Sequence, residues 1–122
     1  MSERYVIEVE PEVRLWLLNL SPSDYETAEF AADRLSERAA TLGEPHSRHL
    51  GSGVRELRFN LGPNRDAARV TYWLAPSRRV VLLTVFRKTK DRETAEVERA
   101  QRAKAVCEAE HEPAHLSFSR EV

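Results

Sequence analysis

Apolar and polar side chains alternate along two stretches in the middle of the chain, Val54–Phe59 and Ala68–Leu74, and a third, mostly apolar stretch follows at Val80–Lys88. Successive side chains of a β-strand point to opposite faces of the sheet, so this pattern predicts three strands with an apolar face and a polar face. Residues typical of turns separate the strands at Leu61–Asp66 and Ala75–Arg78. We therefore expect an antiparallel meander.

The parity of the apolar residues predicts which side chains of the meander face the core. The third strand is the least regular, because Val80–Phe86 is apolar throughout and is also typical of a central strand buried on both faces. The expected core residues are Leu57 and Phe59 in the first strand, Ala68, Val70, Tyr72 and Leu74 in the second, and Val81, Leu83 and Val85 in the third.

A strand and two helices are predicted before the meander. Tyr5–Val9 has the composition of a strand, and Pro11 suits the first turn of a short helix. Ser21 can cap a long second helix, with Asp24 completing a capping box, and Gly43 ends it. The apolar stripes are Val13, Trp16, Leu17 and Leu20 on the short helix, and Tyr25, Ala28, Ala31 or Ala32, Leu35, Ala39 and Leu42 on the long one.

The remaining segments are a loop, a last helix and a tail. Gly43–Gly53 is rich in Gly, Ser and His and is predicted to be a loop. Asp91 can cap a helix over about Arg92–Glu110, whose small apolar residues would let it lie close to the sheet or to the long helix. The tail, residues 111–122, is expected to be either flexible or a short edge strand.

Together these elements predict an α+β protein with the order β-α-α-β-β-β-α: a small, twisted, mostly antiparallel sheet with helices packed on one face. Its 122 residues suit a single domain, which we expect to span 1–122. No apolar run approaches the ~20 residues of a membrane span, and no secretory signal pattern is found, so we expect a cytoplasmic protein with no membrane partner. The single cysteine, Cys107, rules out an internal disulfide and indicates helix packing rather than a nucleophile.

Charge is distributed unevenly along the chain, although the net charge is only −1. Met1–Asp33 holds two basic and eight acidic residues, whereas Arg34–Lys104 holds sixteen basic and eight acidic residues. The local field governs what docks on a surface, so the near-neutral total does not exclude an anionic partner.

Strand parity concentrates basic side chains on the polar face of the meander. Such a face is expected to bind an anionic partner. Trp73 and Phe86 share its parity and either stack on nucleic-acid bases or belong to the core. The charged residues expected on this face are Glu56, Arg58, Arg69 and Lys88.

These four residues match the needs of RNA cleavage by attack of a 2′-hydroxyl on the adjacent phosphate, which takes a base, cations on the phosphate oxygens and an acid. Arg58, Arg69 and Lys88 suit the phosphate and the leaving group. Glu56 is either the base or an ion-paired carboxylate that holds Arg58 or Arg69. A carboxylate among three cations is expected to be strongly acidic, which favours the structural role. Arg69 is expected to be exposed.

Other basic residues lie near this face. Arg55 and Arg87 have the opposite parity, so they either contact RNA backbone at the rim or support the sheet. His46 and His49 lack the further ligands that a zinc site requires, so no metal is expected. His49 is expected to be solvated or to contact a phosphate. We expect no cofactor.

Short motifs resemble those of the HigB-like, phage-derived branch of the RelE/ParE toxin superfamily. They are G-x-x-E-L-R-F at Gly53–Phe59, R-V-x-Y at Arg69–Tyr72 and L-L-x-x-F-R-K at Leu82–Lys88, followed by a helix. The resemblance covers Tyr5 to about Cys107. Arg87 and Lys88, with Lys90 beyond them, stand where the family commonly has a lysine pair, and we expect them at the RNA site.

This resemblance implies the toxin of a type II toxin–antitoxin module: a metal-independent endoribonuclease that cleaves messenger RNA on the ribosome. Its partner would be a helix-turn-helix antitoxin, with which it forms a hetero-oligomer. The family's RNA site would correspond to Arg58, Arg69 and Lys88. Two alternatives stay open: a ParE-like toxin that binds DNA gyrase without catalysis, and a degenerate copy that only binds its antitoxin.

Overall fold

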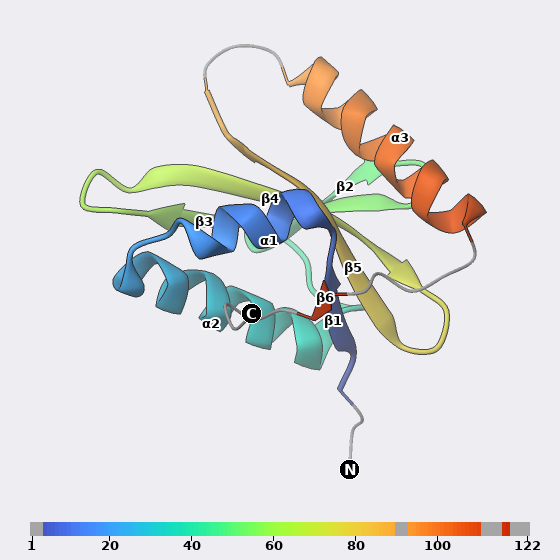
Figure 1. Cartoon of the computed structure of the whole chain (residues 1–122), viewed down its shortest axis with the longest axis horizontal. Coiled ribbons are helices and arrows are strands. Elements are labelled where there is room, and N and C mark those ends of the chain that lie inside the picture. Colours follow the sequence, from blue (N-terminus) through green and yellow to red (C-terminus); the bar gives the residue numbers. More distant parts are fainter. Residues whose placement is uncertain (1–3, 90–92, 111–115, 118–122) are drawn as a thin grey trace.

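The computed structural model describes residues 4–89 and 93–110 and the backbone of residues 116–117 (Figure 1). The element order confirms the predicted α+β fold and adds a short strand before the meander. Another short strand lies within the tail, where an edge strand was one of the two expectations. The elements are β1 (Val6–Val9), α1 (Pro11–Leu18), α2 (Pro22–Arg38), β2 (Ser47–Gly51), β3 (Val54–Leu61), β4 (Asp66–Ala75), β5 (Arg79–Arg87), α3 (Thr94–Ala109) and β6 (Leu116–Ser117).

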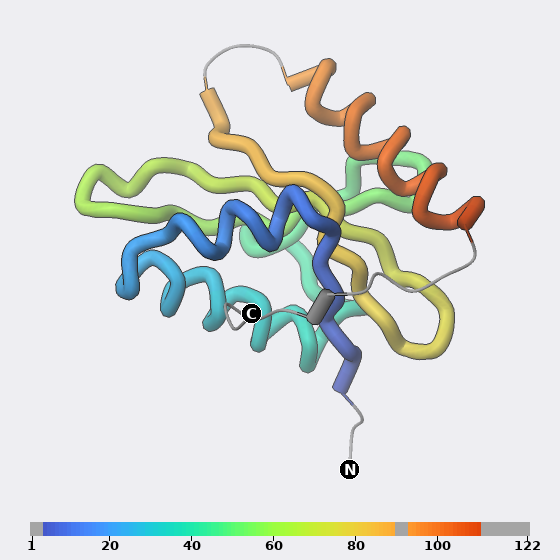
Figure 2. The backbone as a smooth tube through the Cα atoms, viewed as in Figure 1, coloured from blue at the N-terminus to red at the C-terminus, as the bar shows by residue number. Residues whose placement is uncertain are grey.

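The strands of the described residues form one six-stranded sheet in the order β2-β3-β4-β5-β1-β6. The antiparallel meander of β3, β4 and β5 is confirmed (Figure 2). The turn between β3 and β4 contacts the start of α2, because the Gly62 amide donates a hydrogen bond to Asp24 Oδ1 at 3.0 Å. β1 is parallel to β5, and β6 pairs with β1 on the side away from β5. Within the predicted loop Gly43–Gly53, Ser47–Gly51 instead forms β2, an edge strand antiparallel to β3.

One side of the sheet, here called the helix face, is covered by α1 and α2. Its core includes Val13 and Leu17 of α1, Leu35 of α2, and Leu57 and Tyr72 of the meander, each at most 3% exposed. The predicted N-cap of α2 is confirmed, because Ser21 Oγ accepts a hydrogen bond from the Asp24 amide at 3.2 Å. The helix face is thus a continuous apolar layer.

The last helix, α3, packs on the opposite side of the sheet, so the expectation that all helices share one face is wrong for this element. Ala103 and Cys107 of α3 contact Trp73, Val81 and Leu83, which form a second core cluster. Figure 1 shows α3 well apart from the α1–α2 pair. Small residues on α3 allow this close approach, and Cys107 is buried in the packing, as predicted.

A β-bulge in β5 explains why its predicted core parity fails in the first half of the strand. Thr71 pairs with Thr84, but the next residue of β4, Tyr72, pairs with Leu82, so Leu83 is the extra residue. The bulge turns Leu82 toward the helix face and Leu83 toward α3. The alternative of a central strand buried on both faces is therefore the correct one.

Two predicted helix boundaries differ from the structure. The helix α2 ends at Arg38, and a short turn carries the buried Ala39 and Leu42 to Gly43. The residue before α3 is Glu93, whereas the predicted cap Asp91 lies outside the described residues.

Candidate functional site

The side of the sheet opposite α1 and α2 carries a group of charged residues next to the part that α3 covers; it is called the charged face below. Directly paired residues of antiparallel strands point to the same side, so strand register defines its members. Arg48 of β2 pairs with Glu56 of β3, and Arg58 of β3 pairs with Arg69 of β4. Glu56, Arg58 and Arg69 therefore share one face, as predicted.

Glu56 is the centre of this group and is only 1% exposed. Its Oε2 atom lies 3.6 Å from Arg58 Nε, 3.7 Å from Arg48 Nε and 3.9 Å from Arg69 Nε. These distances permit charge attraction but exceed the range of a hydrogen bond. Its Oε1 atom is buried and accepts no hydrogen bond from the described part of the chain. One carboxylate thus has three guanidinium neighbours and an uncommitted oxygen.

Burial raises the pKa of Glu56 above its usual value, which corrects the expectation of a strongly acidic carboxylate. The loss of hydration outweighs the opposing attraction of Arg48, Arg69 and Arg58, and the negative charge of Glu93 raises the pKa further. The three cations are too weakly coupled to restore the ordinary value, because their closest approaches are 3.6–3.9 Å. A raised pKa makes the ionised carboxylate a stronger base.

Arg69 is buried, with a side chain 8% exposed, so the expectation of an exposed residue is wrong. Its Nη1 donates a hydrogen bond to the Ala68 carbonyl at 3.0 Å, while its Nε has no hydrogen-bond partner among the described residues. Burial, together with the positive charge of Arg58, lowers its pKa. Phe86, which pairs with Arg69 across the strands, is itself buried and contributes to this shielding.

Arg58 and Lys88 line the more open part of the group. The Arg58 side chain is 22% exposed, and its Nη1 lies 4.0 Å from Glu44 Oε1. Lys88 follows Phe86 by two positions and forms an ion pair with Glu93, the residue that precedes α3. Since Glu93 acts electrostatically on both Glu56 and Arg69, Lys88 is held at the margin of the same group.

Of the predicted base-stacking residues, Trp73 belongs to the core. It packs with α3, and Lys104 Nζ lies 5.0 Å from the centre of its ring. Phe86 is 9% exposed and lies beside Arg69. For both aromatic residues the structure therefore favours the core alternative.

The other predicted RNA contacts lie away from the charged face. Arg55 is on the helix face, where its Nη1 donates to the Ala39 carbonyl at 3.0 Å, and His49 pairs with it and is exposed on the same side. Arg87 also has helix-face parity and lies 3.6 Å from Asp66. Arg55 thus supports the sheet, one of its two predicted roles, and Lys90 lies outside the described residues.

Sequence reasoning missed Arg48, because it assigned the segment around it to a loop. The signal was present: Gly51-Ser52-Gly53 separates Ser47–Leu50 from the strand that begins at Val54, a spacing typical of a hairpin. All three residues of this turn have positive φ, which suits the two glycines. Pairing with β3 then directs Arg48 toward Glu56.

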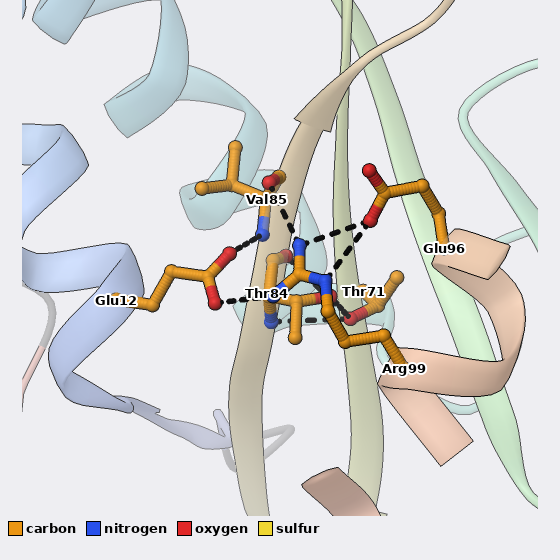
Figure 3. Close-up of polar contacts among 6 residues, drawn as sticks. All are labelled: Glu12, Thr71, Thr84, Val85, Glu96 and Arg99. Carbon is orange, nitrogen blue, oxygen red and sulfur yellow. Dashed lines mark hydrogen bonds and ion pairs between the residues drawn. The ribbon is translucent and has the colours of Figure 1, made fainter. Parts of the chain in front are cut away.

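A polar network joins the charged face to α1 and α3 at the second half of β5, beyond the residues that pair with β1 (Figure 3). Glu12 accepts a hydrogen bond from the Val85 amide at 3.0 Å, and Arg99 binds Glu12 at 2.5 Å and Glu96 at 3.0 Å. Next to it, the buried hydroxyls of Thr71 and Thr84 lie 2.5 Å apart on the charged-face side of the bulge. This network satisfies an open strand edge and fixes β5 beside the site.

Within the described residues, no three His, Cys, Asp or Glu side chains are grouped so that they could hold a metal ion. No helix among those residues combines the length and the apolar character that crossing a membrane requires.

Comparison with known proteins places the chain in a family. Residues 15–105 match the family described as phage derived protein Gp49-like (DUF891). A comparison with curated protein sequences gave no significant match. Among solved structures, the chain is similar to the E. coli toxin RelE, solved in the free state as a double arginine-to-alanine mutant, with a TM-score of 0.56 and 13% sequence identity. That match covers 83% of this chain and 97% of the RelE chain.

The two comparisons support different statements. At 13% identity the likeness to RelE shows a shared fold. The family match spans well over half of the chain, from α1 into α3. The protein therefore belongs to the Gp49-like family of phage-derived proteins and has the RelE fold, as its resemblance to the RelE/ParE superfamily predicted.

Proposed function

We propose that the protein is the toxin of a type II toxin–antitoxin module and that it cleaves messenger RNA on the ribosome without a metal ion. The observation that carries this proposal is the buried carboxylate of Glu56 beside the guanidinium groups of Arg48, Arg58 and Arg69. An anionic substrate and a proton-abstraction step both fit this arrangement. The family membership and the RelE fold agree with it.

Glu56 acts as the general base in the proposed reaction. RNA binding has to expose this buried carboxylate, which then takes the proton of a ribose 2′-hydroxyl. The 2′-oxygen bonds to the adjacent phosphorus as the bond from phosphorus to the 5′-oxygen breaks. The products are a 2′,3′-cyclic phosphate and a 5′-hydroxyl end. The raised pKa of Glu56 favours this role over the purely structural one, because a carboxylate of ordinary acidity is a poor base for a hydroxyl.

The cations supply the remaining functions. Arg58 and Arg69, whose guanidinium groups lie beside Glu56, would stabilise the negative charge that builds up on the phosphate oxygens. Lys88, at the open margin with its side chain 39% exposed, donates the proton that the leaving 5′-oxygen requires. Binding of RNA would compete with Glu93 for this ammonium group.

The proposal includes the partners that the family resemblance implies. The protein would act in the cytoplasm, where ribosomes present the messenger RNA. A helix-turn-helix antitoxin would hold it inactive in a hetero-oligomer. Tight control by a partner is expected for any enzyme that stops translation.

Regulated expression in bacteria tests the proposal. Wild-type protein should arrest incorporation of labelled amino acids within minutes and create new messenger RNA ends that primer extension detects. Glu56→Gln should abolish both effects, because the amide cannot accept the proton. Arg102→Ala is a matched control: it removes an exposed arginine of α3 that lines a groove between α3 and β5 rather than the Glu56 group.

Three other outcomes would contradict the proposal. Continued growth with intact messenger RNA would remove the nuclease function. DNA-damage signalling with continued protein synthesis would instead support binding to gyrase. Arrest that persists in Glu56→Gln would show that this carboxylate is not the base.

A further inference from the structure

Arg48 differs from the other two arginines around Glu56 in its exposure to solvent. Its side chain is 47% exposed, compared with 22% for Arg58 and 8% for Arg69. It belongs to β2, an edge strand, whose only strand partner within the described part of the chain is β3. A ligand that approaches the charged face along this edge therefore meets Arg48 first.

The attachment of Arg48 to Glu56 is loose. Its Nε lies 3.7 Å from Glu56 Oε2, beyond hydrogen-bond range, and its guanidinium forms no hydrogen bond with another described residue. A long, half-exposed side chain held only by charge attraction can turn toward solvent at small cost. Arg69, in contrast, is fixed by burial and by its bond to the Ala68 carbonyl.

We propose that Arg48 is a positioning residue that exchanges partners during catalysis: it leaves Glu56 to bind the RNA phosphate next to the scissile one. The inference rests on the proposed nuclease function. A guanidinium binds a phosphate through two parallel hydrogen bonds, which are stronger than the long contact that it has with Glu56. Release from Arg48 would leave Glu56 with fewer cations around it at the moment when it must accept a proton.

The electrostatic balance at Glu56 makes this exchange effective. Among the neighbouring cations, Arg48 opposes the rise of the Glu56 pKa most strongly. When Arg48 leaves, one of the charges that lower the Glu56 pKa is lost while burial still raises it, so the carboxylate becomes more basic when substrate is bound. Among the residues that the structure describes, the charged groups that act on Glu56 are Arg48 from β2, Arg58 from β3, Arg69 from β4 and Glu93 before α3. Glu93 is itself paired with Lys88 after β5.

The pH dependence of cleavage on programmed ribosomes tests this exchange. The acidic limb of kcat/KM reports Glu56 in the free enzyme, and the acidic limb of kcat reports it in the substrate complex. Arg48→Ala should move the acidic limb of the kcat/KM pH profile to higher pH and raise KM. The acidic limb of the kcat pH profile should stay in place, because Arg48 has already left Glu56 in the wild-type substrate complex. Arg48→Lys, which keeps the charge, should restore the wild-type limb of kcat/KM.

A purely structural role for Arg48 predicts a different result. If Arg48 stays on Glu56 throughout the reaction, Arg48→Ala moves both limbs together, and this outcome would overturn the inference. Unchanged limbs and unchanged KM would overturn it as well. The Arg102→Ala control should match wild type in every profile.

A measurement that needs no activity separates this inference from the proposed function. Titration of the 13C-labelled Glu56 carboxyl by NMR in the free protein should show a higher pKa in Arg48→Ala than in wild type. An equal pKa in the two proteins would contradict the inference even if wild type cleaves RNA. If the pKa shifts as expected but wild-type protein cleaves no RNA on ribosomes, the electrostatic coupling stands, whereas the proposed function and the catalytic role of Arg48 both fail.

Discussion

The two faces of the sheet show how one set of strands can serve two purposes. The helix face packs Leu57, Tyr72 and Leu82 under α1 and α2 and has an apolar interior. The charged face has an apolar cluster where α3 covers it, around Trp73, and next to that cluster it buries Glu56 among arginines that lie beyond hydrogen-bond range. The helix face gains stability from burial of apolar surface, whereas the charged face buries a carboxylate oxygen without a hydrogen bond from the described residues, which costs stability.

The largest expected effect is the loss of RNA cleavage in a variant of the charged face. Glu56→Gln should reduce cleavage by about 10²–10⁴-fold, the usual contribution of a general base. It should leave the helix face and its near-ultraviolet circular dichroism unchanged. Single-turnover cleavage of messenger RNA on purified ribosomes measures the loss. A variant with more than a tenth of wild-type activity would refute the assignment of Glu56 as base.

The next largest expected effect is a loss of folding stability in a variant of the helix face. Leu82→Ala removes a side chain that is 1% exposed and should lower the free energy of unfolding by about 2–5 kcal/mol. Urea denaturation followed by circular dichroism measures this change. Leu15→Ala is the control, because Leu15 is 63% exposed and its truncation should cost less than about 0.5 kcal/mol. Equal effects of the two substitutions would contradict the described packing of α1 against the sheet.

Arg69→Ala should affect both properties, because this residue is buried yet belongs to the charged face. We expect a loss of about 1–3 kcal/mol in the free energy of unfolding, since Glu56 loses a neighbouring cation and a cavity forms. Cleavage should fall in addition, at temperatures where the variant remains folded. A variant as stable as Arg102→Ala would show that Arg69 is exposed in solution, as its sequence pattern predicted.

The smallest expected effect is a pH dependence of stability. A carboxyl whose pKa is raised on folding binds its proton more tightly in the folded state, so its contribution is most favourable at low pH and declines as pH rises from about 4.3 through the raised pKa of Glu56. Relative to Glu56→Gln, wild type should therefore lose stability over that interval. Urea titrations at a series of pH values measure the difference. A difference that instead grows with pH would mean that the three arginines dominate over burial.

Several features of the fold and the site could be predicted from local sequence. Ser21 and Asp24 mark the start of α2 by capping chemistry that needs no distant partner. The alternation in β3 and β4 placed Glu56, Arg58 and Arg69 on one face, because a strand's side-chain period depends on backbone geometry alone. The resemblance to the RelE/ParE superfamily rested on motifs in these same strands and led to the correct fold.

Other features depend on contacts between segments that are distant in sequence. β2 is short and polar. The glycines at Gly51 and Gly53 indicate a hairpin, but only the register with β3 shows that Arg48 lies opposite Glu56. The bulge at Leu83 lies in a strand that packs against the α1–α2 core on one side and against α3 on the other. The pattern of apolar residues in β5 does not indicate the position of this register shift.

The charged face has some properties that the sequence determines and others that depend on tertiary structure. Sequence alone determined that a carboxylate and several arginines share a surface. Only the folded structure decided that Glu56 and Arg69 are buried and that Arg48 completes the group. The physical reason is that a pKa depends on hydration and on distances of a few ångströms, and both are set when strands and helices pack, so the carboxylate expected to be strongly acidic is instead made more basic.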